Sequence, residues 1–251
     1  MSTVGTHASI NFLFESTPLA DNGYAYVDVL ADSALVPGKI VTQNAGSSDP
    51  EWYYQVGGGG LNGAFASKLE GVLGTVNARL QSAYAARFGA HRFANDPTLP
   101  LERRPLTSFL VELDPQPPVG RNVAGMMYSV GPRVGDQGLT GDLLLAYTQV
   151  YVDAMAAIAS SPTKIDGFRI TLISSGIYLD AATVEPFSLA AAGAIINAVR
   201  IGVKKSNGRL TGLSILINTS DKHPEVITGF TRAATAAGAK VTGHGFTVAV
   251  P

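Results

Sequence analysis

The stretch Val56-Gly57-Gly58-Gly59-Gly60-Leu61-Asn62-Gly63-Ala64-Phe65 stands at the start of a long segment of helical period. Four consecutive glycines leave the backbone without Cβ atoms, so it can approach a bound molecule closely. The amides of such a segment, together with the amino end of the following helix, favour phosphate groups. A flexible surface loop is the alternative interpretation. The stretch alone therefore predicts either a phosphate-binding loop or a plain turn.

Three better-known glycine motifs fit this stretch poorly. Gly58, Gly60 and Gly63 match the dinucleotide spacing G-x-G-x-x-G, but residues 51–55 make a poor parallel strand and no second strand ends in an acid at the expected distance. The Walker pattern fails because Ala64 stands where a lysine should follow. The chain has no G-x-S-x-G elbow, which counts against an α/β-hydrolase.

Outward from the glycines, short apolar or β-branched runs alternate with longer alanine-rich segments of helical period. We expect strands at residues 10–15, 24–30, 39–42, 123–129, 168–173, 213–217 and within 245–250. We expect helices at residues 63–88 (broken near Gly74), 141–159, 186–204 and 224–237. Strand and helix in repeated order predict an α/β layered sheet.

One segment interrupts this order. Residues 93–118 hold many of the prolines and the pair Arg103 and Arg104. They are interpreted as an irregular insertion and not as a domain boundary. Because no internal repeat is visible, we expect residues 1–251 to form a single domain.

The composition excludes several classes of function. The 251 residues carry 18 Lys+Arg against 19 Asp+Glu, a net charge of -1, which argues against a nucleic-acid partner. Cysteine is absent, and the four histidines share no metal spacing, so we expect no metal site and no cofactor. Residues 1–10 lack the pattern of a signal peptide. The most apolar stretch, 189–203, contains Arg200 and is too short to span a bilayer, so we expect a buried helix, no membrane partner and a cytoplasmic location, with a host-directed effector as the alternative.

A second loop strengthens the ligand-binding interpretation. The apolar run 168–173 leads directly into Ser174-Ser175-Gly176-Ile177-Tyr178, and a third loop at 129–132 follows another expected strand. Open α/β sheets bind ligands at the carboxyl ends of their strands. Two glycine-bearing loops that leave one sheet edge are suited to hold a pyrophosphate from both sides.

At this point the sequence resembles the macrodomain family of ADP-ribose-binding modules. Five stretches in chain order carry the resemblance: Asp28-Val29-Leu30, residues 39–47, residues 57–64, residues 128–132 and residues 174–178. The last is the most specific, since Ser174-Ser175-Gly176-Ile177-Tyr178 is similar to the family's Ser-Thr-Gly-Ile-Tyr. The resemblance implies a three-layer α/β/α sandwich with a central mixed sheet.

The resemblance also implies roles. Asp28 would accept a hydrogen bond from the adenine amino group, and Val29 would pack near the base. Tyr178 would pack near the distal ribose. The loops that wrap the distal ribose and the diphosphate would include Asn44, Ser47, Gly57, Gly58, Gly59, Gly60, Leu61, Gly131, Ser174, Ser175, Gly176 and Ile177.

Departures from the family pattern concern the catalytic candidates Asn44, Asn62, Asp49 and Glu51. The second asparagine of the family's Asn-Ala-Ala-Asn is either Ser47 or Asn44, depending on where a gap is placed. Asn62 stands where one hydrolytic class has an aspartate, and an amide cannot act as a carboxylate base. Asp49 or Glu51, in a lengthened loop with several aromatic residues, is the alternative acid that would activate a water. The paired-glutamate motif of another glycohydrolase class is not matched.

Three functions therefore follow, in order of preference. The first is binding of ADP-ribose, with hydrolysis of mono-ADP-ribosyl linkages on proteins at the distal ribose. The second is a non-catalytic reader of ADP-ribose, its polymers or a related nucleotide. The third is an α/β enzyme that uses Gly58, Gly60 and Gly63 for a dinucleotide. In the first two, the partner is ADP-ribose or an ADP-ribosylated protein.

Overall fold

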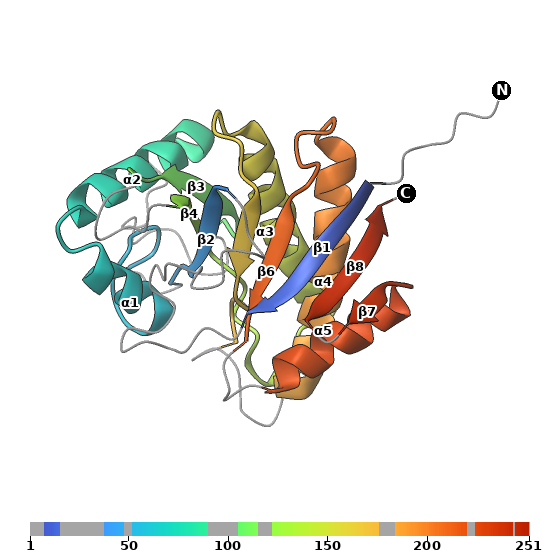
Figure 1. The fold of residues 1–251 in the computed structure, drawn as a ribbon. Helices are drawn as coiled ribbons and strands as arrows, with labels where there is room; N and C mark the ends of the chain where they lie inside the picture. Colours follow the sequence, from blue (N-terminus) through green and yellow to red (C-terminus); the bar gives the residue numbers. More distant parts are fainter. Residues whose placement is uncertain are drawn as a thin grey trace.

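An eight-stranded mixed sheet runs through the molecule (Figure 1). The computed structural model describes residues 8–15, 38–47, 52–89, 105–114, 122–175, 184–219, 224–242 and 244–250. The strands are β1 (Ala8–Glu15), β2 (Ile40–Ala45), β3 (Ser108–Glu112), β4 (Val123–Ser129), β5 (Gly167–Ile170), β6 (Ser214–Asn218), β7 (Lys240–Thr242) and β8 (Gly245–Val250).

The strand order is β3-β4-β2-β5-β6-β1-β8-β7. The five strands from β4 to β1 are parallel to one another, and β3, β8 and β7 pair antiparallel at the two sides. The carboxyl ends of β4, β2, β5, β6 and β1 therefore lie along one edge of the sheet. This is the edge at which open α/β sheets place their ligands.

Helices cover both faces of the sheet. Helices α3 (Gly141–Ser160), α4 (Val184–Lys205) and α5 (Pro224–Ala236) bury one face, and α1 (Gly60–Lys68) and α2 (Leu73–Phe88) lie on the other (Figure 1). A short 3-10 turn, η3 (Gly135–Gln137), precedes α3. Two hydrophobic cores result, one on each face, as the three-layer prediction requires.

Helices α4 and α5 approach each other closely because a glycine stands at their contact. A Cβ at Gly229 in α5 would lie 2.7 Å from the backbone carbonyl carbon of Ser188 in α4. Just past the end of α5, Gly238 has φ +71°, the left-handed conformation in which glycine commonly ends a helix.

One irregularity interrupts the central ladder. Ile40 pairs with Val123, but the next residue, Val41, pairs with Gly125, so β4 carries one extra residue at this point. A Cβ at Gly125 would lie 2.9 Å from the Val111 carbonyl oxygen on β3. The close approach explains why glycine occupies the bulge.

The bounds of most predicted elements are confirmed to within three residues, and the predicted helix break is confirmed between Lys68 and Leu73. Residues 108–112 are a correction: they form β3 inside the segment expected to be irregular, because antiparallel pairing with β4 satisfies their backbone. The short strand β7 was not expected either. The strand predicted at 24–30 lies outside the described residues.

The prediction that the most apolar stretch is too short to span a bilayer is wrong, because the helix that contains it is longer than residues 189–203. Helix α4 has 22 residues, and by length and composition alone both α3 and α4 could cross a membrane. The prediction of a buried helix is confirmed, since 61% of the apolar window of α4 is buried inside the protein.

Candidate functional site

Two loops meet at the carboxyl edge of the parallel strands. The loop after β4 brings Gly131 against the loop after β5, where a Cβ on Gly131 would lie 2.5 Å from the Ser174 Oγ atom and 3.0 Å from Ile173. The second loop turns sharply: Ser174 has φ +67°, and the Ser175 amide donates to the Leu172 carbonyl over 3.3 Å. Gly131 is thus glycine because the two loops touch.

The glycine loop leads into α1 at the same edge. Gly58 and Gly60 have φ of +73° and +61°, so both need glycine for conformational reasons. A Cβ on Gly63 would lie 2.2 Å from the Gly58 carbonyl oxygen, so the helix folds directly back on the loop. Gly59 and Gly60, by contrast, face open space.

The amino end of α1 presents backbone amides at the edge of the site. Within the described residues, no side chain caps Gly59, and the first turn holds no acidic residue. The first amides of a helix have no intrahelical partner and carry a partial positive charge. Because Gly58, Gly59 and Gly60 are exposed, these amides are available to an anion.

Two side chains support the glycine loop from behind. The Trp52 ring lies flat against it, since Cβ atoms on Gly57 and Gly58 would lie 2.2 and 3.1 Å from ring carbons. Asn77 in α2 accepts a hydrogen bond from the Val56 amide over 2.8 Å and donates to the Val56 carbonyl over 3.4 Å. Asn77 thus fixes the backbone just ahead of the four glycines, and Trp52 supports the first two of them.

Tyrosines anchor the lengthened loop that precedes the glycines. Tyr53 and Tyr54 are fully buried, and both hydroxyls donate to the Pro105 carbonyl, over 2.6 and 2.7 Å. The Tyr128 hydroxyl lies 2.8 Å from the Gln55 carbonyl and 3.2 Å from that of Trp52. Burial raises the pKa of Tyr54 well above its ordinary value. These tyrosines therefore hold the loop in place and do not cover a ligand.

Asn44 and Asn62 form a buried pair beneath the site. The Asn44 Nδ2 donates to the Asn62 Oδ1 over 2.9 Å, and the Asn62 Nδ2 donates to the Gln55 carbonyl over 2.9 Å. Asn44 has no exposed surface, and its Oδ1 has no hydrogen-bond partner in the part of the chain that the structure describes. The geometry favours a role in fixing α1 on β2 over direct contact with a reacting group.

Comparison with solved structures identifies the known fold to which this architecture corresponds. No protein-family model matches the chain, and no curated protein matches it in sequence. An asparagine-to-alanine mutant of the Oceanobacillus iheyensis macrodomain matches 94% of this chain and 98% of its own, with TM-score 0.51 and 16% identity. A glycine-to-valine mutant of that macrodomain with ADPR matches 91% and 98%, with TM-score 0.51 and 15% identity. The same macrodomain with ADP matches 79% and 84%, with TM-score 0.50 and 16% identity.

The chain has the macrodomain fold. The resemblance that the five sequence stretches indicate is thereby confirmed at the level of the fold, as is the three-layer α/β/α sandwich.

The predicted site residues divide into those that the structure describes and those that it does not. The described ones lie at the carboxyl edge. Ser47 follows β2 and Leu61 lies in the first turn of α1, and both are half-buried; Gly131 lies in the loop after β4, and Ser175 is exposed on the loop after β5. Asp28, Val29, Asp49, Glu51, Gly176, Ile177 and Tyr178 lie outside the described residues, so their roles stay predictions.

Asn218, the last residue of β6, lies at the same edge but is not among the predicted site residues. Its side chain is 6% exposed, and neither its Oδ1 nor its Nδ2 has a hydrogen-bond partner among the described residues. A buried amide without partners is costly unless a ligand or water satisfies it. The signal in the sequence was a polar residue at the end of the apolar run 215–217, at the same edge as the two loops.

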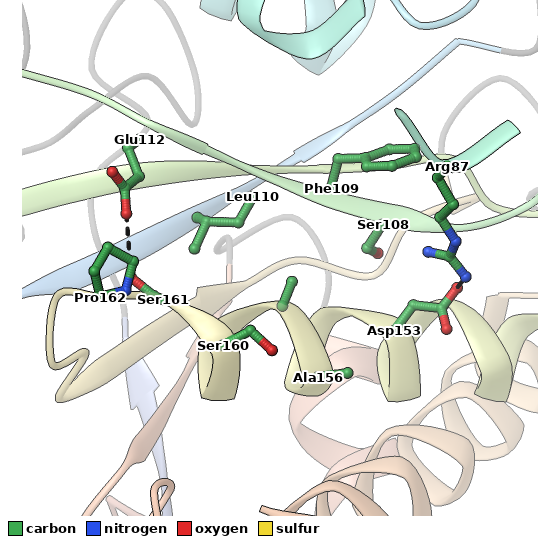
Figure 2. A pocket seen from close by; sticks show the side chains of 11 residues that line it. Arg87, Ser108, Phe109, Leu110, Glu112, Asp153, Ala156, Ser160, Ser161 and Pro162 are labelled. Atoms are coloured by element: carbon green, nitrogen blue, oxygen red, sulfur yellow. Dashed lines mark hydrogen bonds and ion pairs between the residues drawn. The ribbon is translucent and has the colours of Figure 1, made fainter. Parts of the chain in front are cut away.

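A separate hollow lies between β3 and α3 in this macrodomain fold, and no predicted site residue lines it (Figure 2). Its volume is about 500 Å³. Arg87 and Asp153 form an ion pair of 3.1 Å at one end, and Glu112 lies beside Ser161 at the other. Within the described ranges, no three His, Cys, Asp or Glu side chains come together as metal ligands.

Proposed function

We propose that the protein binds ADP-ribose at the carboxyl edge of its parallel strands. The observation that carries this proposal is the contact of Gly131 with Ser174 at the carboxyl edge, the edge at which the glycine loop also leads into the uncapped amino end of α1. Two loops and a helix end supply backbone amides around one edge of the sheet. A diphosphate is the ligand group that such neutral amides bind best.

The diphosphate would be held without lysine or arginine. Ser174 would donate its amide from one side, with the amides of Gly176 and Ile177 continuing the loop past Ser175, whose amide donates to the Leu172 carbonyl. The exposed glycines 58–60 would donate from the other side. This mode of binding suits a chain whose net charge is -1, because fixed peptide dipoles replace a basic patch.

The two ends of the ligand would lie in different surroundings. Asp28 and Val29 would hold the adenine. The side-chain amide of Asn218, which has no hydrogen-bond partner among the described residues, supports a polar contact at the same edge. Ser47, Leu61 and Tyr178 would surround the distal ribose. The matched macrodomain structures were solved with ADP and with ADPR, which supports this class of ligand.

We also propose hydrolysis at the distal ribose, with the carboxylate of Asp49 or Glu51 activating the attacking water. Positioning of the ribose would supply the catalysis. The burial of Asn44 and Asn62 favours the second candidate, a non-catalytic reader of ADP-ribosylated proteins. In that case the amide pair only shapes the pocket.

Calorimetry with ADP-ribose tests the binding proposal directly. We expect a 1:1 complex, at least tenfold weaker for Asp28→Ala, which removes the adenine acceptor, and for Gly176→Glu, which introduces a negative charge beside the diphosphate. Absence of heat and of thermal stabilisation at millimolar ligand contradicts binding. Reduced dinucleotide binding without ADP-ribose binding would favour the dinucleotide enzyme instead.

A second assay separates the hydrolase from the reader. A mono-ADP-ribosylated protein is incubated with the wild type and with the double variant Asp49→Asn, Glu51→Gln. A hydrolase releases ADP-ribose and slows at least tenfold in the double variant. A reader leaves the modification in place while still binding it.

A further inference from the structure

The sheet opens between β2 and β5 just below the proposed site. The β2–β5 ladder ends at Thr42 and Arg169, whereas the β2–β4 ladder continues to Ala45 and Ser129. Beyond the last β2–β5 pair, the loop after β5 diverges from β2. Ser174 and Ser175 lie in the part of the chain that follows this divergence.

Side chains replace the ladder at the opening. The Thr171 amide donates to the Gln43 Oε1 over 3.2 Å, and the Thr171 carbonyl accepts from the Tyr151 hydroxyl over 2.8 Å. Both backbone groups of Thr171, the first residue past β5, are thus held by side chains from β2 and α3. The Tyr151 oxygen also lies 3.3 Å from the Gln43 Oε1.

Gln43 is itself fixed from its other side. Its Nε2 donates to the Ser129 Oγ over 3.1 Å, and the Ser129 and Ser108 hydroxyl oxygens are 2.7 Å apart. Gln43 and Tyr151 are both buried. Since both polar ends of the Gln43 amide have partners, the side chain has one favoured conformation and acts as a rigid spacer.

We infer that Gln43 and Tyr151 are positioning residues that set the geometry of the diphosphate-binding loop. By holding Thr171, they place the tight turn of Leu172 to Ser175 against Gly131. Neither side chain touches the ligand. The inference rests on the proposed function, because it assigns these two residues to the ADP-ribose site.

The test compares Gln43→Met and Tyr151→Phe with a matched control, Ser108→Ala. Methionine keeps the length of Gln43 but cannot accept from the Thr171 amide, and phenylalanine removes only the hydroxyl. Ser108 belongs to the same buried network but does not contact Thr171. We expect ADP-ribose affinity to fall at least tenfold for Gln43→Met, threefold or more for Tyr151→Phe, and less than twofold for Ser108→Ala.

A second measurement reports on the backbone. Hydrogen exchange at the Thr171 amide should accelerate at least tenfold in Gln43→Met, while the Val41 and Thr42 amides keep wild-type protection. Should Gln43→Met fail to fold, Tyr151→Phe carries the affinity test alone.

Failure of the proposed function and failure of the positioning role alone give different results. A wild type that does not bind ADP-ribose overturns the proposed function and this inference with it. A wild type that binds, with variants that bind equally well or an unchanged Thr171 exchange rate, overturns the positioning role alone.

Discussion

The side chain of Asn44 in β2 donates a hydrogen bond to that of Asn62 in α1, and the Asn62 side chain in turn donates a hydrogen bond to the Gln55 carbonyl. One buried amide pair thereby joins a central strand, the first helix and the loop ahead of the glycines. The orientation of both amides is determined, because each donor has a defined acceptor.

Asn62→Asp introduces the carboxylate that one hydrolytic class has at this position, and we expect it to destabilise the protein. An ionised aspartate still accepts from Asn44 but presents an oxygen to the Gln55 carbonyl, so the unfolding free energy should fall by about 2 kcal/mol at pH 7. Burial against that carbonyl favours the protonated acid, so the loss should shrink as the pH falls toward 4. Urea denaturation at both pH values measures this, and a loss independent of pH contradicts the assigned orientation.

Gly63→Ala and Gly59→Ala separate packing from ligand approach. The Gly63 Cβ would meet the Gly58 carbonyl at 2.2 Å, so the loop must shift, at a cost of about 2 kcal/mol. Gly59 has φ -106° and open space around it, so alanine there should change stability by less than about 1 kcal/mol.

Affinity completes the comparison of these two glycines. Both variants should bind ADP-ribose at least fivefold more weakly, Gly63→Ala through the displaced loop and Gly59→Ala through its methyl group. Thermal unfolding and calorimetry on the same samples decide. Unchanged affinity in Gly59→Ala would remove the exposed glycines from the ligand site.

Tyr53 and Tyr54 share a single acceptor, the Pro105 carbonyl. Each single Tyr→Phe change should cost less than about 1 kcal/mol, since the other hydroxyl still satisfies that carbonyl, and the double change should cost about 2 kcal/mol. A double-mutant cycle in urea measures the coupling. Strict additivity would show that the two hydrogen bonds are independent.

Tyr151 should make the protein sensitive to high pH. Burial raises its pKa from 10.0 to about 12, so the unfolded state releases the proton first as the pH rises above 10. The unfolding free energy should therefore fall between pH 10 and 12, by on the order of 2 kcal/mol from this residue. Tyr151→Phe should fall less steeply over the same range in urea titrations, although burial also raises the pKa of Tyr147. Equal slopes for both proteins would contradict the raised pKa.

Much of the fold could be predicted from the sequence because apolar periodicity reports burial directly. The runs that became β4 and β8 have the predicted bounds. Strand β3 was missed because the prolines around it favour irregular structure, whereas its backbone is satisfied by β4, a partner that no local pattern reveals.

The site was predictable only in part, for a similar reason. The glycines within residues 57–63 were predicted to form a ligand-binding loop. Two of them are glycine because of packing: Gly57 lies against the Trp52 ring, and Gly63 lies against the Gly58 carbonyl. Gln43 and Asn218 were not predicted to belong to the site. Their importance depends on which strands are neighbours, and strand order is a property of the tertiary structure.

The extra residue in β4 has a consequence for orientation. Val123 and Tyr128 are an odd number of positions apart, yet both belong to the core beneath α1 and α2, which an uninterrupted strand with its two-residue alternation would forbid. The bulge changes the parity. If Ala124 were deleted together with the bulge, Val123 and Tyr128 would be four positions apart and would still face the same layer. A one-residue deletion here should therefore be less harmful than one in the regular part of β4, which would turn one end of the strand toward the opposite layer.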